Sequence, residues 1–129
     1  IVLLPQGTMS EAIRAGGAGI GGVYTPVSVG TMLAKDKETK RIANKEYVLQ
    51  TPIQADFAFI KAKKADKYGN LVYSKSSRNF NPVMATAAKV TIAEVDELVD
   101  VGNLNPEEVV TPHLYVDYIV VNGGLDYEC

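Results

Sequence analysis

The sequence has very little cysteine, no tryptophan and no excess of positive charge. Its single cysteine, Cys129, is the last of 129 residues. One thiol can neither close an internal disulfide nor build a zinc cluster, and without a second thiol nearby we expect no catalytic role for it. Lys and Arg number 13 against 15 Asp and Glu, giving a formal net charge of −2. This balance gives no reason to expect nucleic acid or an anionic membrane as a partner.

Long apolar runs are also missing. No segment approaches the length of a membrane span, and no basic-then-apolar leader with a cleavage site opens the chain, so we expect no membrane association. The chain is expected to be soluble and intracellular. What the sequence does have is 47% hydrophobic and 22% charged residues, which predicts one globular domain with a real core.

The first eighteen or so residues predict a strand, a turn and a helix. The apolar run Ile1 to Leu4, ended by Pro5, is typical of a buried parallel strand. A chain that opens inside such a strand, without methionine, suggests that an N-terminal portion is missing. Thr8-Met9-Ser10-Glu11 matches a capping box, so we expect a helix from there to a glycine cap at Gly16 or Gly17.

A glycine-rich stretch follows and contains a motif with a well-known function. Gly17, Gly19 and Gly22 have the spacing G-x-G-x-x-G that binds a dinucleotide pyrophosphate in a Rossmann unit. That site needs the glycines at the N-terminal end of a helix, whereas here they follow the predicted helix, whose C-terminal end repels phosphate. We therefore reject a dinucleotide site. The glycines instead allow the backbone to approach a core neighbour or a ligand closely.

The remainder of the chain predicts strands with short helices between them. The charged segment 35–45 is interpreted as an exposed hairpin or excursion. Proline suits a first helical turn, so Asn81-Pro82 is expected to start a small-residue helix. Strands are expected at 55–62, 71–73, 89–95 and 115–121, with a turn at 68–70. This order predicts an α/β fold: an open, mostly parallel sheet with flanking helices.

Few side chains stand out as candidates for chemistry. His113 follows Thr111-Pro112 without an acidic or serine partner at a readable spacing, so a surface or capping role is favoured over catalysis. The acidic residues lack the spacing of a calcium loop, and no metal site is predicted. Gln6 differs, because a turn between a strand and a helix places it at the carboxyl end of a strand, where open α/β sheets bind ligands.

Several motifs, in register along nearly the whole chain, resemble the α subunit of family I CoA-transferases. They are Pro5-Gln6-Gly7-Thr8, Ile13-Arg14-Ala15-Gly16-Gly17-Ala18-Gly19, Tyr24-Thr25-Pro26, Val29-Gly30-Thr31, Ala65-Asp66 with Gly69-Asn70, Ser77-Arg78-Asn79-Phe80-Asn81, Val110-Thr111-Pro112 and Tyr115-Val116. The nearest types are the 3-oxoacid CoA-transferases. The family's glycine-rich G-G-F segment is expected upstream of Ile1, which makes residues 1–129 the C-terminal part of the α-subunit domain.

The resemblance implies an open α/β fold like that of ribose-phosphate isomerases, and a reaction shared between two subunits. Such enzymes move CoA between an acyl-CoA and a short-chain carboxylic or 3-oxo acid through a glutamyl-CoA thioester. Their nucleophilic glutamate belongs to the β subunit and lies in a Ser-Glu-Asn-Gly setting, which no glutamate here has. CoA is therefore expected as a substrate, with no permanently bound cofactor, and the expected partner is a β subunit in a hetero-oligomer. The fragment alone is expected to be inactive. The resemblance also implies a location in the cytoplasm of a bacterium, or in the mitochondrial matrix if the source is eukaryotic.

The resemblance also assigns candidate site residues. Gln6 matches the family's oxyanion-hole glutamine, and its alternative role is a turn glutamine bonded to local backbone. Gly16, Gly17, Ala18 and Gly19 are expected to form a close wall beside the acyl pocket at the interface between subunits. Asn79, in the segment 78–81, is expected to contact the acyl group or CoA, or this segment simply braces the next helix. Two other functions stay open: a non-catalytic phosphosugar-binding domain and a purely structural subunit of the same fold.

Overall fold

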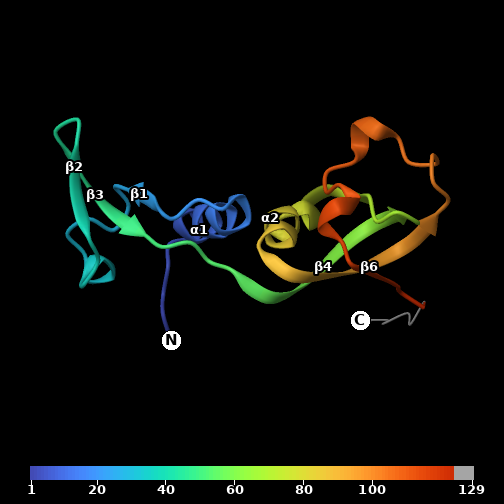
Figure 1. Cartoon of the computed structure of the whole chain (residues 1–129), viewed down its shortest axis with the longest axis horizontal. Coiled ribbons are helices and arrows are strands. Elements are labelled where there is room, and N and C mark those ends of the chain that lie inside the picture. Colours follow the sequence, from blue (N-terminus) through green and yellow to red (C-terminus); the bar gives the residue numbers. More distant parts are fainter. Residues whose placement is uncertain (124–129) are drawn as a thin grey trace. The chain divides into compact units, whose positions relative to one another are not determined.

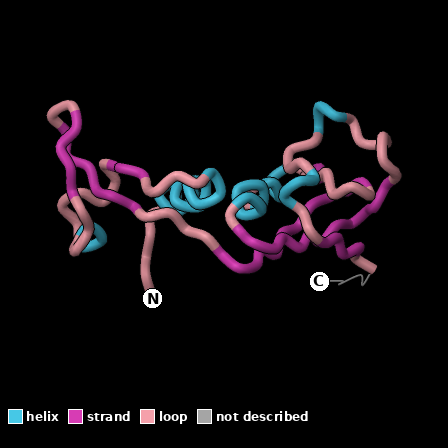
Figure 2. Tube along the Cα trace, viewed as in Figure 1, coloured by secondary structure: helices cyan, strands magenta, loops and turns pink. Residues whose placement is uncertain are grey.

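The computed structural model describes residues 1–123, and Cys129 lies outside the described residues. The chain forms two compact units, the first from Ile1 to Gln54 and the second beginning at Ala55. Each unit has its own sheet, and Figures 1 and 2 show one long helix in the first and the larger sheet in the second. The units are described one at a time below.

The first unit is built around helix α1, Gln6–Ala18, which is the helix expected from the sequence with different ends. Pro5 is its N-cap residue and provides no side-chain hydrogen bond, so the predicted capping box is wrong: Thr8 already lies in the first turn. Proline suits this boundary, because its φ of −59° is close to helical and it has no N–H to satisfy. Gln6 is thus the first helical residue rather than part of a turn.

The C-terminal end of α1 also differs from the prediction. Gly16 and Gly17 continue the helix, and Gly19 ends it in the left-handed conformation with φ of 70°. The amides of Gly19 and Ile20 both donate to the carbonyl oxygen of Ala15. The motif glycines therefore lie at the C-terminal end of the helix (Gly17 and Gly19) or after it (Gly22), as the rejection of a dinucleotide site required.

The predicted strand at residues 1–4 is not formed. Ile1, Val2 and Leu3 are exposed, and within the described residues no strand pairs with this segment. An apolar run becomes a parallel strand only where a neighbouring strand accepts its backbone hydrogen bonds. Apolar composition alone was therefore misleading here.

Three short antiparallel strands complete the first unit. Strand β3 (Lys45–Gln50) lies between β1 (Val23–Thr25) and β2 (Thr39–Ile42). Strands β2 and β3 form a hairpin whose turn, Ala43-Asn44, has both residues at positive φ, as a two-residue hairpin turn of this kind requires. Every residue of β2 is exposed, which confirms the expected exposed hairpin.

The second unit contains the expected, mostly parallel sheet. Its strand order is β5-β4-β6-β7, with β4 (Ala55–Asp66) parallel to β6 (Ala88–Val99) and β6 parallel to β7 (Tyr118–Val121). Only β5 (Leu71–Val72) is antiparallel to its neighbour β4. The strands β4 and β6 are longer than predicted, while β7 starts later, because residues 113–115 form a 3-10 turn.

One face of this sheet is the core of the second unit. Helix α2 (Asn81–Thr86) packs against β4 and β6, and the side chains there are small and buried: Ala58, Ile60, Ala62, Ala65, Leu71, Ala85, Ala93 and Val95. The opposite face is exposed and mixes large apolar side chains, including Phe57, Phe59 and Tyr118, with the ion pair of Lys61 and Glu94. The predicted helix start at Asn81-Pro82 is confirmed.

The loop between β4 and β5 is organised by one buried carboxylate, Asp66. Its Oδ1 accepts the backbone amides of Tyr68, Gly69 and Asn70 at 3.0 Å each, and its Oδ2 accepts the Asn70 side-chain amide at 2.8 Å. Asn70 in turn accepts the backbone N–H of His113 at 2.9 Å. Burial alone would raise the pKa of the Asp66 carboxyl, but these hydrogen bonds together lower it below its usual value.

We expect Asp66→Asn to destabilise the protein by about 2 to 3 kcal/mol, measured by chemical denaturation. An amide nitrogen in place of Oδ2 would face the Asn70 amide donor, and the backbone amides would lose a charged acceptor. The matched control is Asp56→Asn, which breaks the exposed pair with Lys89 at 2.8 Å and should change stability by no more than about 0.5 kcal/mol. Equal effects of the two substitutions would contradict this assignment.

The same carboxylate gives stability a defined pH dependence. Because folding lowers its pKa, its contribution is complete above the pKa of an unfolded aspartate and is lost as the pH falls through the folded pKa. Stability of the Asp66→Asn protein should therefore fall less steeply with acidification than that of the wild type.

Candidate functional site

Each unit carries a hollow on its surface. The first, here called the N-terminal hollow, has a volume of about 590 Å³ and lies at the start of α1. Part of its wall comes from the first turns of the helix and the rest from β1 and the residues after it. The lining residues are Pro5, Gly7, Thr8, Ser10, Glu11, Val23, Tyr24, Thr25, Pro26 and Val27. The motifs Pro5-Gln6-Gly7-Thr8 and Tyr24-Thr25-Pro26, separate in the sequence, thus meet at one place.

Gln6 is exposed and lies between two residues that line this hollow, Pro5 and Gly7. Its position at the start of a helix matters, because backbone N–H groups in a first turn have no partner within the helix and carry partial positive charge. The first amide bonded along the helix is that of Met9, which donates to the carbonyl oxygen of Pro5 at 2.9 Å. The start of α1 thus carries unpaired backbone amides and the exposed residue Gln6, which is not itself among the residues that line the hollow.

From the sequence, Thr8 is interpreted as a helix cap and not as a candidate site residue. It is 7% exposed, lines the hollow, and its hydroxyl oxygen is buried without a hydrogen-bond partner. A buried polar group without a partner is uncommon in folded proteins and needs an explanation. The pattern Thr-x-x-Glu predicts a hydroxyl with a partner, because the threonine oxygen of a capping box accepts a backbone N–H.

The predicted glycine wall lies at the other end of α1. Gly16 is ten residues from Gln6, a distance of roughly 15 Å along a helix. It is buried against the segment before β4: a Cβ at Gly16 would lie 2.0 Å from the carbonyl oxygen of Ile53, and the Gln54 side chain donates to the Gly16 carbonyl at 3.0 Å. The close approach of a core neighbour thus accounts for Gly16. The structure does not bring Gly17, Ala18 and Gly19 to the N-terminal hollow. Their role in substrate binding stays a prediction.

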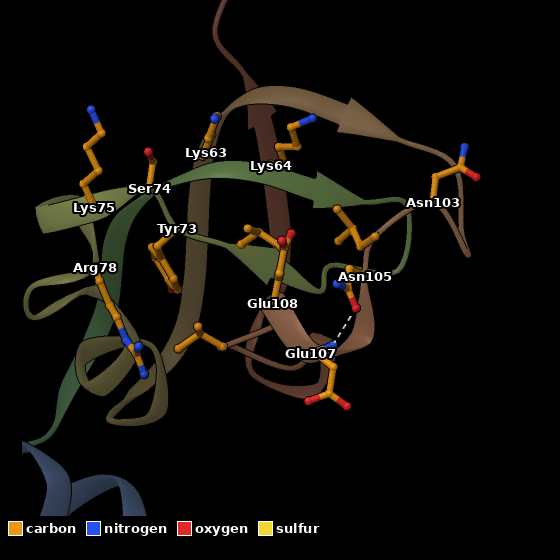
Figure 3. A pocket seen from close by; sticks show the side chains of 13 residues that line it. Lys63, Lys64, Tyr73, Ser74, Lys75, Arg78, Asn103, Asn105, Glu107 and Glu108 are labelled. Carbon is orange, nitrogen blue, oxygen red and sulfur yellow. Dashed lines mark hydrogen bonds between the residues drawn. The ribbon is translucent and has the colours of Figure 1, made fainter.

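The second hollow, about 550 Å³, belongs to the second unit and is drawn in Figure 3. Side chains of both charges line it: Lys63 and Lys64 come from β4, Lys75 and Arg78 from the turn after β5, and Glu107 and Glu108 from the 3-10 turn Pro106–Glu108. Lys64 is paired with Glu97 at 2.8 Å.

Tyr73 forms part of the same hollow and shares a hydrogen bond of 2.6 Å with Thr111. Burial raises the pKa of its phenol, which the bond to Thr111 and the charge of Arg78 offset only in part, so Tyr73 is neutral near neutral pH. No local sequence pattern indicates this hollow, since its walls come from two separate segments, residues 63–78 and 103–110.

Asn79, the predicted substrate contact of the second unit, follows Arg78 directly but is exposed and does not line the hollow. Its backbone has φ of 30°, an uncommon value for a residue with a side chain. The bracing role falls to Asn81, whose amide donates to the carbonyl of Ser77 at 2.7 Å and whose oxygen accepts the N–H of Lys61 at 3.2 Å. A substrate contact by Asn79 stays a prediction.

The described residues show neither a metal-binding group nor a membrane-spanning helix. No three histidine, cysteine, aspartate or glutamate side chains among residues 1–123 come together in a way that could hold a metal ion. Over the same range no helix is long and apolar enough to cross a membrane. His113, as expected, makes a structural contact: its backbone and ring both approach the Asn70 side-chain oxygen.

Comparison with known proteins decides the family. The family model described as coenzyme A transferase matches residues 1–122. The chain belongs to the coenzyme A transferase family. It is 54% identical over 118 residues to one subunit of the 3-oxoadipate CoA-transferase of Acinetobacter baylyi, covering 92% of this chain and 52% of that protein. It is 48% identical over 122 residues to the α subunit of the acetate CoA-transferase of Escherichia coli K12, covering 95% and 56%.

A third relative belongs to the same kind of enzyme. The chain is 51% identical over 119 residues to one subunit of the succinyl-CoA:3-ketoacid coenzyme A transferase of Helicobacter pylori, covering 92% of this chain and 51% of that protein. The chain thus spans about half the length of the curated relatives that it matches.

Solved structures confirm the α/β fold. An acyl-CoA transferase from Escherichia coli O157:H7, determined as a thioester complex with CoA, aligns with a TM-score of 0.82 at 24% identity, over 92% of this chain and 28% of that one. The AibA/AibB decarboxylase aligns with a TM-score of 0.73 at 25% identity, over 91% and 44%. Because the same fold carries a decarboxylase, the fold does not by itself determine the reaction.

Proposed function

We propose that this chain is part of the α subunit of a CoA-transferase that moves CoA between an acyl-CoA and a short-chain carboxylic or 3-oxo acid. The single observation that carries the proposal is the identity of about half of all residues to one kind of CoA-transferase subunit over nearly the whole chain. The partner is a β subunit, in a hetero-oligomer. The relatives named above are bacterial, and we place the enzyme in the cytoplasm.

The proposed reaction proceeds through two covalent intermediates on the β subunit. A glutamate carboxylate of the partner attacks the thioester carbonyl, forming an acyl-glutamyl anhydride and releasing CoA thiolate. The thiolate attacks the glutamyl carbonyl, which gives a glutamyl-CoA thioester and frees the first acid. The second acid then reverses these steps and leaves as the new acyl-CoA. No glutamate of this chain lies in a Ser-Glu-Asn-Gly setting, which supports a nucleophile supplied by the partner.

The proposed part of this chain in catalysis is to stabilise negative charge. Every attack in the sequence places a negative charge on a carbonyl oxygen, and a fixed neutral donor stabilises that oxygen without titrating. We assign this task to the side-chain amide of Gln6. Its exposure at the start of α1 leaves the amide accessible to a reacting group supplied from outside this unit.

The other two functions considered from the sequence are less well supported. A purely structural subunit would not need an exposed side-chain amide at the start of α1, where Gln6 lies. The relatives at about 50% identity are transferases by name rather than sensors.

The experiment that tests the proposal is reconstitution with the β subunit. The full-length α subunit, co-expressed with its β subunit, is incubated with acetoacetyl-CoA and a second carboxylate such as succinate or acetate. We expect CoA to move to the second acid only when both subunits are present. A complex that binds a sugar phosphate but transfers no CoA to any short-chain acid would overturn the proposal.

A further inference from the structure

We propose that Asn122 is a site of spontaneous modification, at which the backbone nitrogen of Gly123 attacks the side-chain amide and converts it to aspartate and isoaspartate. Asn122 directly follows strand β7, whose last residue is Val121. The proposal rests on the chemistry of this residue pair and on its surroundings in the second unit. It is independent of the transfer reaction.

The reaction needs no enzyme and no co-reactant other than water. The deprotonated backbone nitrogen of Gly123 attacks the side-chain carbonyl carbon of Asn122, and the new C–N bond closes a five-membered succinimide ring. The bond to the side-chain nitrogen breaks, and this nitrogen takes a proton from water and leaves as ammonia. Water then opens the ring at either carbonyl carbon, which gives aspartate or isoaspartate. Overall, one water is consumed and one ammonia is released.

The sequence favours this reaction at Asn122 over the other asparagines. Only Asn122 is followed by glycine. Glycine has no Cβ, so its nitrogen approaches the side-chain carbon without hindrance, and its backbone reaches the conformations that ring closure needs. Asn81 and Asn105 precede proline, which has no N–H to lose.

The structure leaves the attacking group of this pair free. Asn122 and Gly123 are exposed, and a Cβ built at Gly123 would have no atom within 4 Å. The backbone amide of Asn122 donates to the carbonyl oxygen of Val95 at 2.8 Å, whereas that of Gly123 donates to no backbone carbonyl among the described residues. The attacking nitrogen therefore lies just beyond the last hydrogen bond of the sheet.

Asn70 shows the opposite arrangement. Its side-chain amide donates to Asp66 at 2.8 Å, so the nitrogen that would leave is held. The nitrogen that would attack belongs to Leu71, which is fully buried and whose amide donates to the carbonyl oxygen of Thr111 at 2.9 Å. We expect Asn70 to stay intact in the folded protein.

The modification changes the charge and the covalent structure after β7 but leaves the sheet in place. Each event adds one negative charge to a chain whose formal net charge is −2. Isoaspartate also directs the main chain through the former side chain, which adds one methylene group to the backbone. The pairing of β6 with β7 ends at Val95 and Val121, before this point, so we expect an unchanged denaturation midpoint.

The test is incubation of the full-length α subunit at mildly alkaline pH, followed by digestion and mass spectrometry. A protease specific for lysine and arginine releases Asn103 and Asn122 in one peptide, because neither basic residue lies between them. Asn103 is also exposed but precedes leucine, which makes it an internal reference. We expect conversion at Asn122 to be at least about tenfold faster than at Asn103. Equal rates at the two asparagines would overturn the inference.

Two further measurements separate the effect of glycine from that of the fold. Gly123→Ala should slow the conversion of Asn122 by at least about tenfold without lowering the denaturation midpoint, because the added Cβ hinders the attack. Wild-type protein unfolded in urea should convert Asn122 at about the same rate as folded protein, since the fold leaves the pair free. An unchanged rate in Gly123→Ala, or a folded rate more than about tenfold below the unfolded one, would show that the proposal is wrong.

Discussion

Replacing Gln6 with alanine is expected to lower kcat of the reconstituted αβ complex by about 100- to 1,000-fold, while KM for either substrate changes little. The amide acts on a charge that exists only in the transition state and in the short-lived tetrahedral intermediates. An interaction of this kind appears in kcat rather than in substrate affinity. The measurement is steady-state kinetics of CoA transfer with both substrates varied.

The control for this prediction is another glutamine of the same unit. Gln54 donates to the Gly16 carbonyl at 3.0 Å and so has a structural task. Gln54→Ala should lower the denaturation midpoint but leave kcat close to that of the wild type. A Gln6→Ala complex that loses affinity alone, with kcat intact, would argue against an oxyanion donor and for a simple binding contact.

A second large effect is expected at Gly16, this time on stability. Gly16→Ala would place a Cβ 2.0 Å from the carbonyl oxygen and 2.8 Å from the carbonyl carbon of Ile53, both backbone atoms that cannot rotate away. That backbone is fixed further by the Ile53 amide, which donates to the Ala12 carbonyl at 2.9 Å. We expect a loss of about 2 to 4 kcal/mol, although alanine favours helix more than glycine does.

Gly7 provides a matched control on the same helix. No atom lies within 4 Å of a Cβ built there, so Gly7→Ala should be neutral or should stabilise the protein by up to about 1 kcal/mol. The same substitution is thus predicted to have opposite signs at two positions of α1. Chemical denaturation followed by far-ultraviolet circular dichroism gives both values, and a tolerated Gly16→Ala would contradict the packing described for Ile53.

The sequence predicted the second unit better than the first, for a physical reason. Strands β4, β6 and β7 carry continuous or alternating apolar residues, and a short helix begins at Asn81-Pro82, so local pattern and final structure agree. In the first unit the outcome depends on contacts between distant segments. Residues 1–4 have strand composition but, among the described residues, no strand beside them.

The ends of α1 show how distant contacts override local signals. Gly16 and Gly17 were expected to end the helix, yet the helix continues through both. Glycine is needed at position 16 for a different reason: the backbone of Ile53 lies where a side chain would otherwise be. The family motif made Gln6 a candidate oxyanion donor without any structure, and that role stays a prediction. The free hydroxyl of Thr8 could not be predicted, because the Thr8 to Glu11 spacing indicates a cap, and only the fold shows that the cap is absent.

The proposed mechanism depends most on the nucleophilic glutamate lying on another polypeptide, the β subunit, and not on this chain. Its most direct test is intact-mass analysis of the full-length αβ complex after incubation with acyl-CoA alone, followed by borohydride treatment of a parallel sample. We expect CoA to become covalently attached to one glutamate of the β subunit, with the α subunit unmodified. Covalent CoA on the α subunit, or turnover without any covalent CoA on either chain, would contradict it.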